Sequence, residues 1–190
     1  YEISACLVGS EMCIRDSHTY AEGDVIYAAS IGAGKIYPEA RLKMPVIKAV
    51  IDKLIEWKPD VIHSQCEFST FFMAKKIADE TNAPIVHTYH TVYEDYTHYF
   101  SPSRSMGRKM AALFTRMICA DCDAVIAPTP KISRLLAGYG VHCPVRIIPT
   151  GLDLQRFAVP RDDALRSRLG LPPKEANKTV LLSLGRLAKE

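Results

Sequence analysis

Residues 60–90 read DVIHSQCEFSTFFMAKKIADETNAPIVHTYH, and this stretch decides the fold. Two short apolar runs, DVIHS and IVHTY, flank a segment at 68–80 whose composition is typical of a helix. Asn82 and Pro84 end that helix, since these residue types interrupt helical segments. The order strand, helix, strand is the unit from which parallel sheets are built. Residues 60–90 therefore predict a parallel pair of strands joined by a helix.

The same alternation continues on both sides of this unit. Residues 45–57 place apolar side chains at helical spacing, with Pro45 at the first position. Thr129 is expected to cap a helix that begins at Pro130. Further helices are expected at 106–119 and 165–169, and loops at 30–44 and at 90–105. Strands are expected at 24–29, 60–64, 85–89, 124–127, 145–149 and 179–184. This alternation predicts an α/β fold, a Rossmann-like parallel sheet with helices on both faces.

Composition excludes several classes of protein. The chain has 190 residues, of which 48% are hydrophobic and 24% charged, the balance of a soluble globular protein. A net charge of +3 is too small to indicate nucleic-acid binding. No apolar stretch approaches the ~20 residues of a membrane-spanning helix. The scattered cysteines indicate a reduced, cytoplasmic chain, and the single pair Cys119 and Cys122 is weak support for a redox or zinc site.

Ligands of parallel α/β sheets bind outside the carboxyl ends of the strands. Polar, aromatic and glycine residues follow five consecutive predicted strands, so we expect one shared cleft there. In the run 87–99, His87 and His90 are three residues apart on an extended segment and point to opposite faces, so no metal site is expected. His87 is expected in the core. His90, at the strand tip, is expected to meet a ligand, and a buried strand-end histidine is the alternative.

The glycine-containing stretches that resemble nucleotide-binding motifs do not match other nucleotide-binding classes. Gly32, Gly34 and Lys35 lack the first glycine and the Ser or Thr of a phosphate-binding loop, since Ile36 follows the lysine. No G-x-G-x-x-G stands between a predicted strand and a helix. A P-loop or nicotinamide enzyme is therefore not indicated.

Four stretches together resemble the GT-B retaining glycosyltransferases of the family-four type. They are HTYHTVYEDYTHYF (87–100), DAVIAPT (123–129), IPTGLDLQRF (148–157) and SLGRLAKE (183–190). Within that group the first stretch is most similar to diacylglycerol glucosyltransferases of bacterial membranes. The resemblance implies the N-terminal half of a GT-B fold. It also implies transfer of a sugar, with retention, from a nucleotide sugar such as a UDP-sugar to a hydroxyl acceptor such as diacylglycerol. No cofactor and no metal are implied.

The resemblance also implies roles for individual residues. His90 would contact the transferred sugar near the reacting centre, as the catalytic residue. The implied acceptor side comprises Glu67, Ser69, Tyr93, Glu94 and Tyr96. The implied donor side comprises Gly151, Gly185 and Arg186. The guanidinium of Arg186 would meet the nucleotide diphosphate, where a fixed positive charge stabilises the leaving group.

The resemblance further suggests how the chain is divided. Residues 1–17 resemble translated sequencing-adapter DNA and are expected to be a non-native leader. Residues 18–148 are expected to form the acceptor-side domain, 149–177 a linker, and 178–190 the first strand of a donor domain. The E-x7-E segment of the family is expected beyond Glu190. The fragment alone is therefore expected to be inactive.

Two features leave alternatives open. The helix at 106–119 carries or adjoins four basic residues, with no acidic residue between them: Arg104, Arg108, Lys109 and Arg116. We expect its apolar face, Met110, Leu113, Phe114, Met117 and Ile118, to pack on the sheet. The alternative is an anionic membrane surface, which would place the protein peripherally at the inner face of the membrane. For function, the alternatives are a nucleotide-sugar epimerase, transfer to a non-lipid acceptor, or a non-catalytic Rossmann-like binding module.

Overall fold

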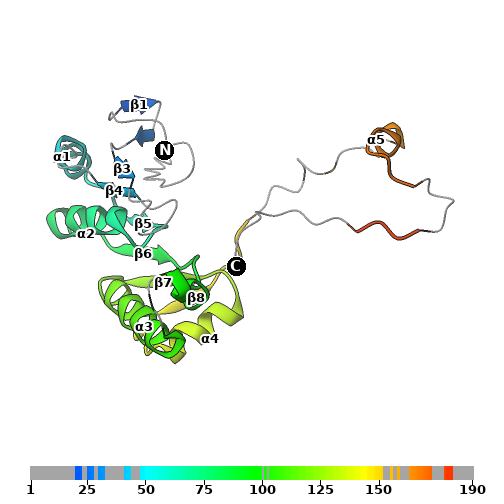
Figure 1. Cartoon of the computed structure of the whole chain (residues 1–190). Helices are drawn as coiled ribbons and strands as arrows, with labels where there is room; N and C mark the ends of the chain where they lie inside the picture. The colour runs from blue at the N-terminus through cyan, green and yellow to red at the C-terminus, as the bar shows by residue number, and fades with distance from the viewer. Residues whose placement is uncertain are drawn as a thin grey trace. The chain divides into compact units, whose positions relative to one another are not determined.

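The computed structural model describes residues 20–22, 25–27, 30–32, 41–43, 48–99, 101, 103–151, 155, 158, 163–172 and 178–181. The chain divides into two compact units, Tyr1–Pro149 and Thr150–Glu190 (Figure 1). The first unit holds the sheet and most of the helices. In the second, the described residues form one short helix, α5 (Asp163–Arg168), close to the helix expected at 165–169.

A four-stranded parallel sheet forms the centre of the first unit. Its strands are β5 (Ile62–Ser64), β6 (Ile85–Thr88), β7 (Ala124–Ala127) and β8 (Val145–Ile147). They lie in the order β5-β6-β7-β8, and each neighbouring pair is parallel. Four of the six strands expected from sequence therefore lie in one parallel sheet, and the α/β, Rossmann-like fold class is confirmed.

Helices alternate with these strands, as expected. They are α1 (Lys48–Trp57), α2 (Ser69–Thr81), α3 (Arg104–Ala120) and α4 (Pro130–Gly138). The side chain of Thr129 caps α4 by accepting a hydrogen bond from the backbone N–H of Ile132. Asn82 ends α2 in the left-handed conformation, at φ 59°, which asparagine adopts more readily than most residues. Pro45, expected to open α1, lies outside the described residues.

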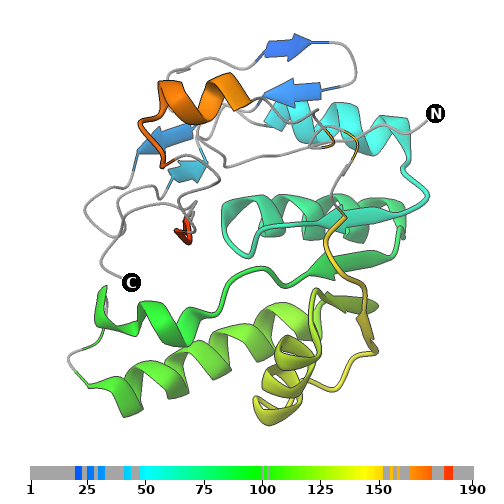
Figure 2. The same ribbon diagram turned by 90° about the vertical axis from the view of Figure 1, so that its right-hand side faces the viewer.

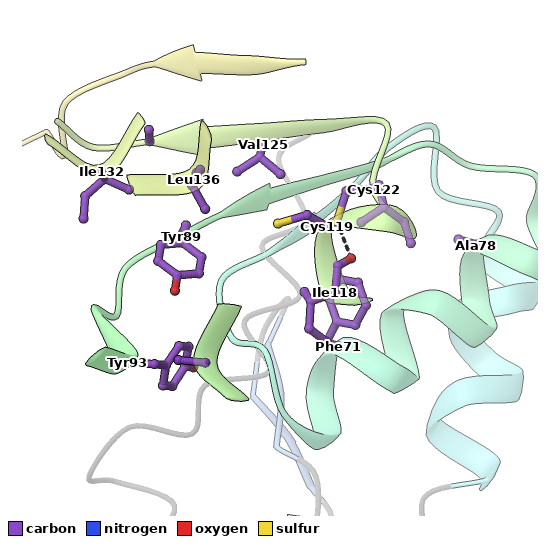
Figure 3. Close-up of a cluster of buried hydrophobic side chains, with 13 residues drawn as sticks. Phe71, Ala78, Tyr89, Tyr93, Ile118, Cys119, Cys122, Val125, Ile132 and Leu136 are labelled. Carbon is purple, nitrogen blue, oxygen red and sulfur yellow. Dashed lines mark hydrogen bonds between the residues drawn. The ribbon is translucent and has the colours of Figure 1, made fainter. Parts of the chain in front are cut away.

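One hydrophobic cluster joins the sheet to α2, α3 and α4 (Figure 3). It includes Ile85 of β6, Tyr89 just after β6, and Val125 and Ala127 of β7. These residues alternate along their extended segments and so share one face of the sheet. Consecutive strand order with right-handed crossovers places successive helices on the same side of a sheet. The described crossover helices therefore cover one face, whereas helices on both faces were expected. A second cluster packs α1 against α2 through Val50, Leu54 and Met73.

The first part of the chain differs from the expected parallel strand and loop. β1 (Tyr20–Glu22) pairs with β2 (Val25–Tyr27), and β3 (Ser30–Gly32) pairs with β4 (Arg41–Lys43). Both pairs are antiparallel and separate from the main sheet (Figure 2, blue). The strand expected at 24–29 thus forms a hairpin. The short β1–β2 connection favours this outcome for the first pair, because adjacent antiparallel strands need only a tight turn.

One other expectation about local structure was wrong, and another is only partly covered by the described residues. The connection after β6, expected to be a loop, contains a 3-10 helix, η3 (Tyr93–Tyr99), which packs against α3 (Figure 2). Within the strand expected at 179–184, the described residues 179–181 are not in a strand.

Candidate functional site

His90 and Gln65 meet at the carboxyl ends of two neighbouring strands. β5 ends at Ser64 and β6 at Thr88, and parallel pairing sets Ser64 opposite His87. The next residues of both strands therefore emerge side by side. His90 Nε2 lies 2.7 Å from Gln65 Oε1, and both side chains are exposed. Since an amide oxygen can only accept, the ring of His90 donates this hydrogen bond.

The hydrogen bonds continue from Gln65 back to the sheet. Gln65 Nε2 lies 3.4 Å from His63 Nδ1, and His63 Nε2 lies 2.7 Å from Thr88 Oγ1. The amide nitrogen donates, so Nδ1 of His63 accepts and its Nε2 carries the proton given to Thr88. Burial lowers the pKa of His63, and so do His87 and His90 nearby. A lowered pKa keeps His63 neutral, as this hydrogen-bond pattern requires.

The buried carboxylate of Glu67 lies beside these hydrogen-bonded side chains. The carboxylate of Glu67 is 3% exposed and accepts a 2.7 Å hydrogen bond from the hydroxyl of Tyr93. Its other oxygen lies 3.5 Å from Nε2 of His87, whose ring is fully buried. Burial and the neighbouring Glu67 raise the pKa of Tyr93, so its hydroxyl stays protonated and can donate. Glu67 thereby fastens η3 to the loop that follows β5.

An aromatic surface extends from the same loop to α3. Phe68 follows Glu67 and is 53% exposed. Its ring stacks on Phe114 of α3 at a centroid distance of 5.8 Å, and both rings contact Tyr93 edge to face. Arg108 of α3 pairs with Glu94 of η3 at 3.1 Å. The strand tips thus adjoin a partly exposed aromatic surface, formed by Phe68 and Phe114, that can contact an apolar ligand.

Sequence comparison assigns the chain to a protein family. A family model described as Glycosyltransferase Family 4 matches residues 12–156, which include β5–β8 and both strand tips. The chain belongs to glycosyltransferase family 4. The family resemblance seen in the sequence motifs is therefore confirmed.

Individual relatives within this family carry more specific names. The chain is 39% identical over 140 residues to an alpha-monoglucosyldiacylglycerol synthase of Streptococcus pneumoniae, covering 71% of this chain and 31% of that protein. It is 29% identical over 171 residues to the synthase of the same name from Acholeplasma laidlawii, covering 83% and 42%. It is 24% identical over 189 residues to a sulfoquinovosyl transferase of Arabidopsis thaliana, covering 96% and 36%. The chain spans less than half the length of each of these family 4 relatives.

Within the family 4 fold, the acceptor-side residues implied by sequence lie together. Glu67 and Tyr93 bind each other and are buried. Glu94 and Tyr96 are half-buried on η3. Ser69 begins α2 directly after the β5 loop. The structure thus brings the implied acceptor residues to the tips of β5 and β6, and their roles stay predictions.

The implied donor-side residues belong to a later part of the chain. Gly151 belongs to the second unit of the chain, and Gly185 and Arg186 lie outside the described residues. The expected divisions after residues 17, 148 and 177 stay predictions. In the described residues, no group of three or more His, Cys, Asp or Glu side chains could hold a metal ion. No helix in the same part of the chain is long and apolar enough to cross a membrane.

Sequence reasoning did not assign roles to Gln65, His63 or Phe68. Gln65 follows β5 as His90 follows β6, and the strand-end rule that identified His90 would also have identified Gln65. His63 lies within β5, and nothing in its sequence position distinguishes it from a structural histidine. Phe68 was assigned to α2, whereas the helix begins one residue later and leaves its ring exposed.

Proposed function

We propose that the full-length protein transfers a sugar from a nucleotide sugar to the hydroxyl of a diacylglycerol-type lipid, with retention of configuration. The observation that carries this proposal is the exposed imidazole of His90, held by Gln65 at the carboxyl end of β6. This end of a parallel sheet is where ligands of such folds bind. The names of the Streptococcus and Acholeplasma relatives favour a diacylglycerol acceptor and a glucosyl donor.

The acceptor would meet the protein beside His90. Glu67 and Tyr93 would act by fixing η3, since both are buried and bound to each other. Glu94, Tyr96 and Ser69 would then form the polar wall around the acceptor hydroxyl. The exposed ring of Phe68 offers an apolar surface next to that wall. A diacylglycerol matches both parts, because a single hydroxyl adjoins its acyl chains.

The donor would be bound by the rest of the protein. Gly151, Gly185 and Arg186 are proposed to contact the nucleotide sugar, with a UDP-sugar as the expected co-substrate. The diphosphate leaving group gains negative charge in the transition state, and the guanidinium of Arg186 would stabilise it. His90 would orient and polarise the transferred sugar instead of forming a covalent bond to it.

The outer face of α3 supports a peripheral membrane location. Met106, Met110, Leu113 and Met117 recur along one stripe and are between 47% and 61% exposed. The prediction that Met110, Leu113 and Met117 pack on the sheet was wrong, whereas Ile118 of the predicted face is buried. The residues that α3 buries are Gly107, Ala111, Thr115, Ile118 and Cys119. A surface pocket at the first turns of α3 is lined by Arg104, Ser105, Arg108 and Lys109. An apolar stripe beside basic side chains suits an anionic lipid surface.

Replacement of His90 tests the proposed chemistry. In the full-length protein, His90→Ala should reduce lipid glucosylation on the order of a hundredfold or more, with the far-UV circular dichroism and the melting temperature unchanged. His142→Ala is the matched control, since His142 is an exposed histidine away from the strand tips. Unchanged turnover of His90→Ala would refute the role of His90.

Product analysis separates the alternatives. With nucleotide sugar and diacylglycerol vesicles, transfer yields a glycolipid. A nucleotide-sugar epimerase would convert the nucleotide sugar with no acceptor present, and a non-catalytic module would leave both substrates intact. A glycosylated product that forms only with a water-soluble acceptor would replace the lipid assignment and retain glycosyl transfer.

Vesicle sedimentation tests the membrane surface. The double variant Met110→Gln, Leu113→Gln should weaken binding to vesicles containing anionic phosphatidylglycerol, and Lys109→Gln, Arg116→Gln should weaken it further at low salt. Binding that is indifferent both to lipid charge and to these four residues would remove α3 from the proposal.

A further inference from the structure

We propose that Gln65 is a positioning residue for His90: it fixes the orientation and the protonated nitrogen of the His90 ring, and it is itself fixed by His63 and Thr88. This inference rests on the proposed role of His90 in glycosyl transfer. It assigns a function to a side chain outside the predicted site, and the hydrogen bonds of the strand tips carry it.

The first step is the polarity of the bond between the two residues. Gln65 presents its carbonyl oxygen to His90 Nε2 at 2.7 Å, and an amide oxygen has no proton to give. Neutral His90 must therefore carry its proton on Nε2. Its other nitrogen, Nδ1, then holds a lone pair, and it has no hydrogen-bond partner among the residues that the structure describes.

The second step is that the amide of Gln65 cannot exchange the positions of its oxygen and nitrogen without losing hydrogen bonds. Its nitrogen faces Nδ1 of His63 at 3.4 Å, which can accept only while the His63 proton sits on Nε2. That proton is held by the hydroxyl of Thr88 at 2.7 Å, and Thr88 is buried in β6. Rotating the amide would set its nitrogen against the Nε2 proton of His90, and its oxygen against the lone pair on Nδ1 of His63, so both hydrogen bonds would be lost. A continuous set of hydrogen bonds thus links Thr88 of the sheet through His63 and Gln65 to His90.

The consequence for the reaction is specific. With Nε2 occupied, neutral His90 can meet a sugar hydroxyl only by accepting a hydrogen bond at Nδ1. A hydroxyl of the transferred sugar would donate to Nδ1, and the ring would stay in one orientation while the sugar binds. Holding a reacting partner in place in advance lowers the barrier, and a misplacement of about 1 Å can cost on the order of a hundredfold in rate.

Nuclear magnetic resonance of the full-length protein tests the structural part. The protein is labelled with 15N-histidine, and the His90 signals are assigned from the His90→Ala variant. The His90 Nε2 proton should be observed as a hydrogen-bonded signal that exchanges slowly with water. It should be lost to fast exchange in Gln65→Leu and retained in Gln65→Glu, whose carboxylate still accepts. A His90 signal that is the same in Gln65→Leu as in the wild type would overturn the proposal.

A double-mutant cycle tests the functional part. Gln65→Leu should lower kcat on the order of tenfold or more, with little change in KM for the nucleotide sugar, and Gln65→Glu should restore part of kcat. In the His90→Ala background, Gln65→Leu should cost nothing further, because its effect acts through His90. Equal losses in both backgrounds would show that Gln65 acts independently of His90 and would overturn the inference.

The two proposals fail in different ways. If the protein transfers no sugar, the proposed function fails, and the His90 signals still report whether Gln65 holds the ring. If transfer is robust but unaffected by Gln65→Leu, the positioning role fails and the proposed function stands. Urea unfolding of Gln65→Leu checks that the variant remains folded. If Gln65→Leu does not fold, Gln65→Asn, which keeps the amide one methylene shorter, takes its place in both experiments.

Discussion

The hydroxyl of Tyr93 donates a 2.7 Å hydrogen bond to the buried carboxylate of Glu67. This bond joins η3, which begins at Tyr93, to the loop that follows β5. The second carboxylate oxygen has only the ring of His87 nearby, at 3.5 Å. The hydroxyl of Tyr93 is therefore the main hydrogen-bond donor that replaces the water which the Glu67 carboxylate loses when it is buried.

Removal of that hydroxyl should be costly. Tyr93→Phe leaves a buried carboxylate short of its donor, so we expect a loss of about 1.5–3 kcal/mol in the free energy of unfolding. Tyr89→Phe is the matched comparison. Its hydroxyl is also buried but bonds the neutral Thr115 at 3.0 Å, so the expected loss is about 0.5–1.5 kcal/mol. Urea unfolding measures both losses. If Tyr93→Phe lost less unfolding free energy than Tyr89→Phe, the stabilising role of the Tyr93–Glu67 hydrogen bond would be contradicted.

The two faces of α3 should respond differently to truncation. Ile118 is 1% exposed and lies in the main cluster, so Ile118→Ala should cost about 2–5 kcal/mol. Leu113 is 61% exposed, so Leu113→Ala should change stability by less than about 0.5 kcal/mol. Urea unfolding of the two variants compares the faces directly. Equal losses would mean that the outer stripe of α3 is covered in solution.

Cys119 should be inert in the folded protein. It is buried, and burial raises the pKa of its thiol to about 12. At pH 8 only about one Cys119 in ten thousand would be a thiolate, the reactive form. Brief treatment with iodoacetamide followed by mass spectrometry should modify the partly exposed Cys66 and leave Cys119 unmodified until urea is added. Modification of Cys119 at the rate of Cys66 without urea would contradict its burial.

His63 should make the protein less stable in mild acid. The pKa of His63 is lowered in the folded state from its ordinary value of 6.5, so the unfolded chain binds this proton more readily. The contribution of His63 is complete above pH 6.5 and is lost as the pH falls from there through the lowered folded value. Urea unfolding between pH 8 and pH 5 should show a steeper loss for the wild type than for His63→Asn. Parallel curves would contradict the lowered pKa.

The sequence predicted the central unit well because its signals are local. Short apolar runs at 60–64 and 85–89, and a helix ended by Asn82, need only neighbouring residues to be recognised. The buried face of α3 could not be recognised in the same way. It is formed partly by small residues, Gly107 and Ala111, whereas the larger Met110 and Leu113 look more like core residues and are exposed. Only the packing partners decide which stripe is buried.

The candidate site was predicted in part for a similar reason. The strand-end rule identifies His90 from its place after an apolar run, and the structure shows it exposed at that strand tip. The bond from His90 to Gln65 joins residues 25 positions apart and depends on side-chain rotamers. The burial of Glu67 depends on η3, which resembles a polar loop in sequence. These relationships arise from tertiary packing and have no sequence period.

The consecutive order β5-β6-β7-β8 has a consequence for how the protein is made. Each of β6, β7 and β8 pairs with the sheet strand immediately before it in the chain, so none of these pairings needs a partner from a later part of the chain. Domains begin to fold from their N-terminal parts during synthesis. Residues 62–147 can therefore assemble one strand-and-helix unit at a time as they leave the ribosome. The sheet edge that carries His90 can then be complete before the residues that follow β8 have been translated.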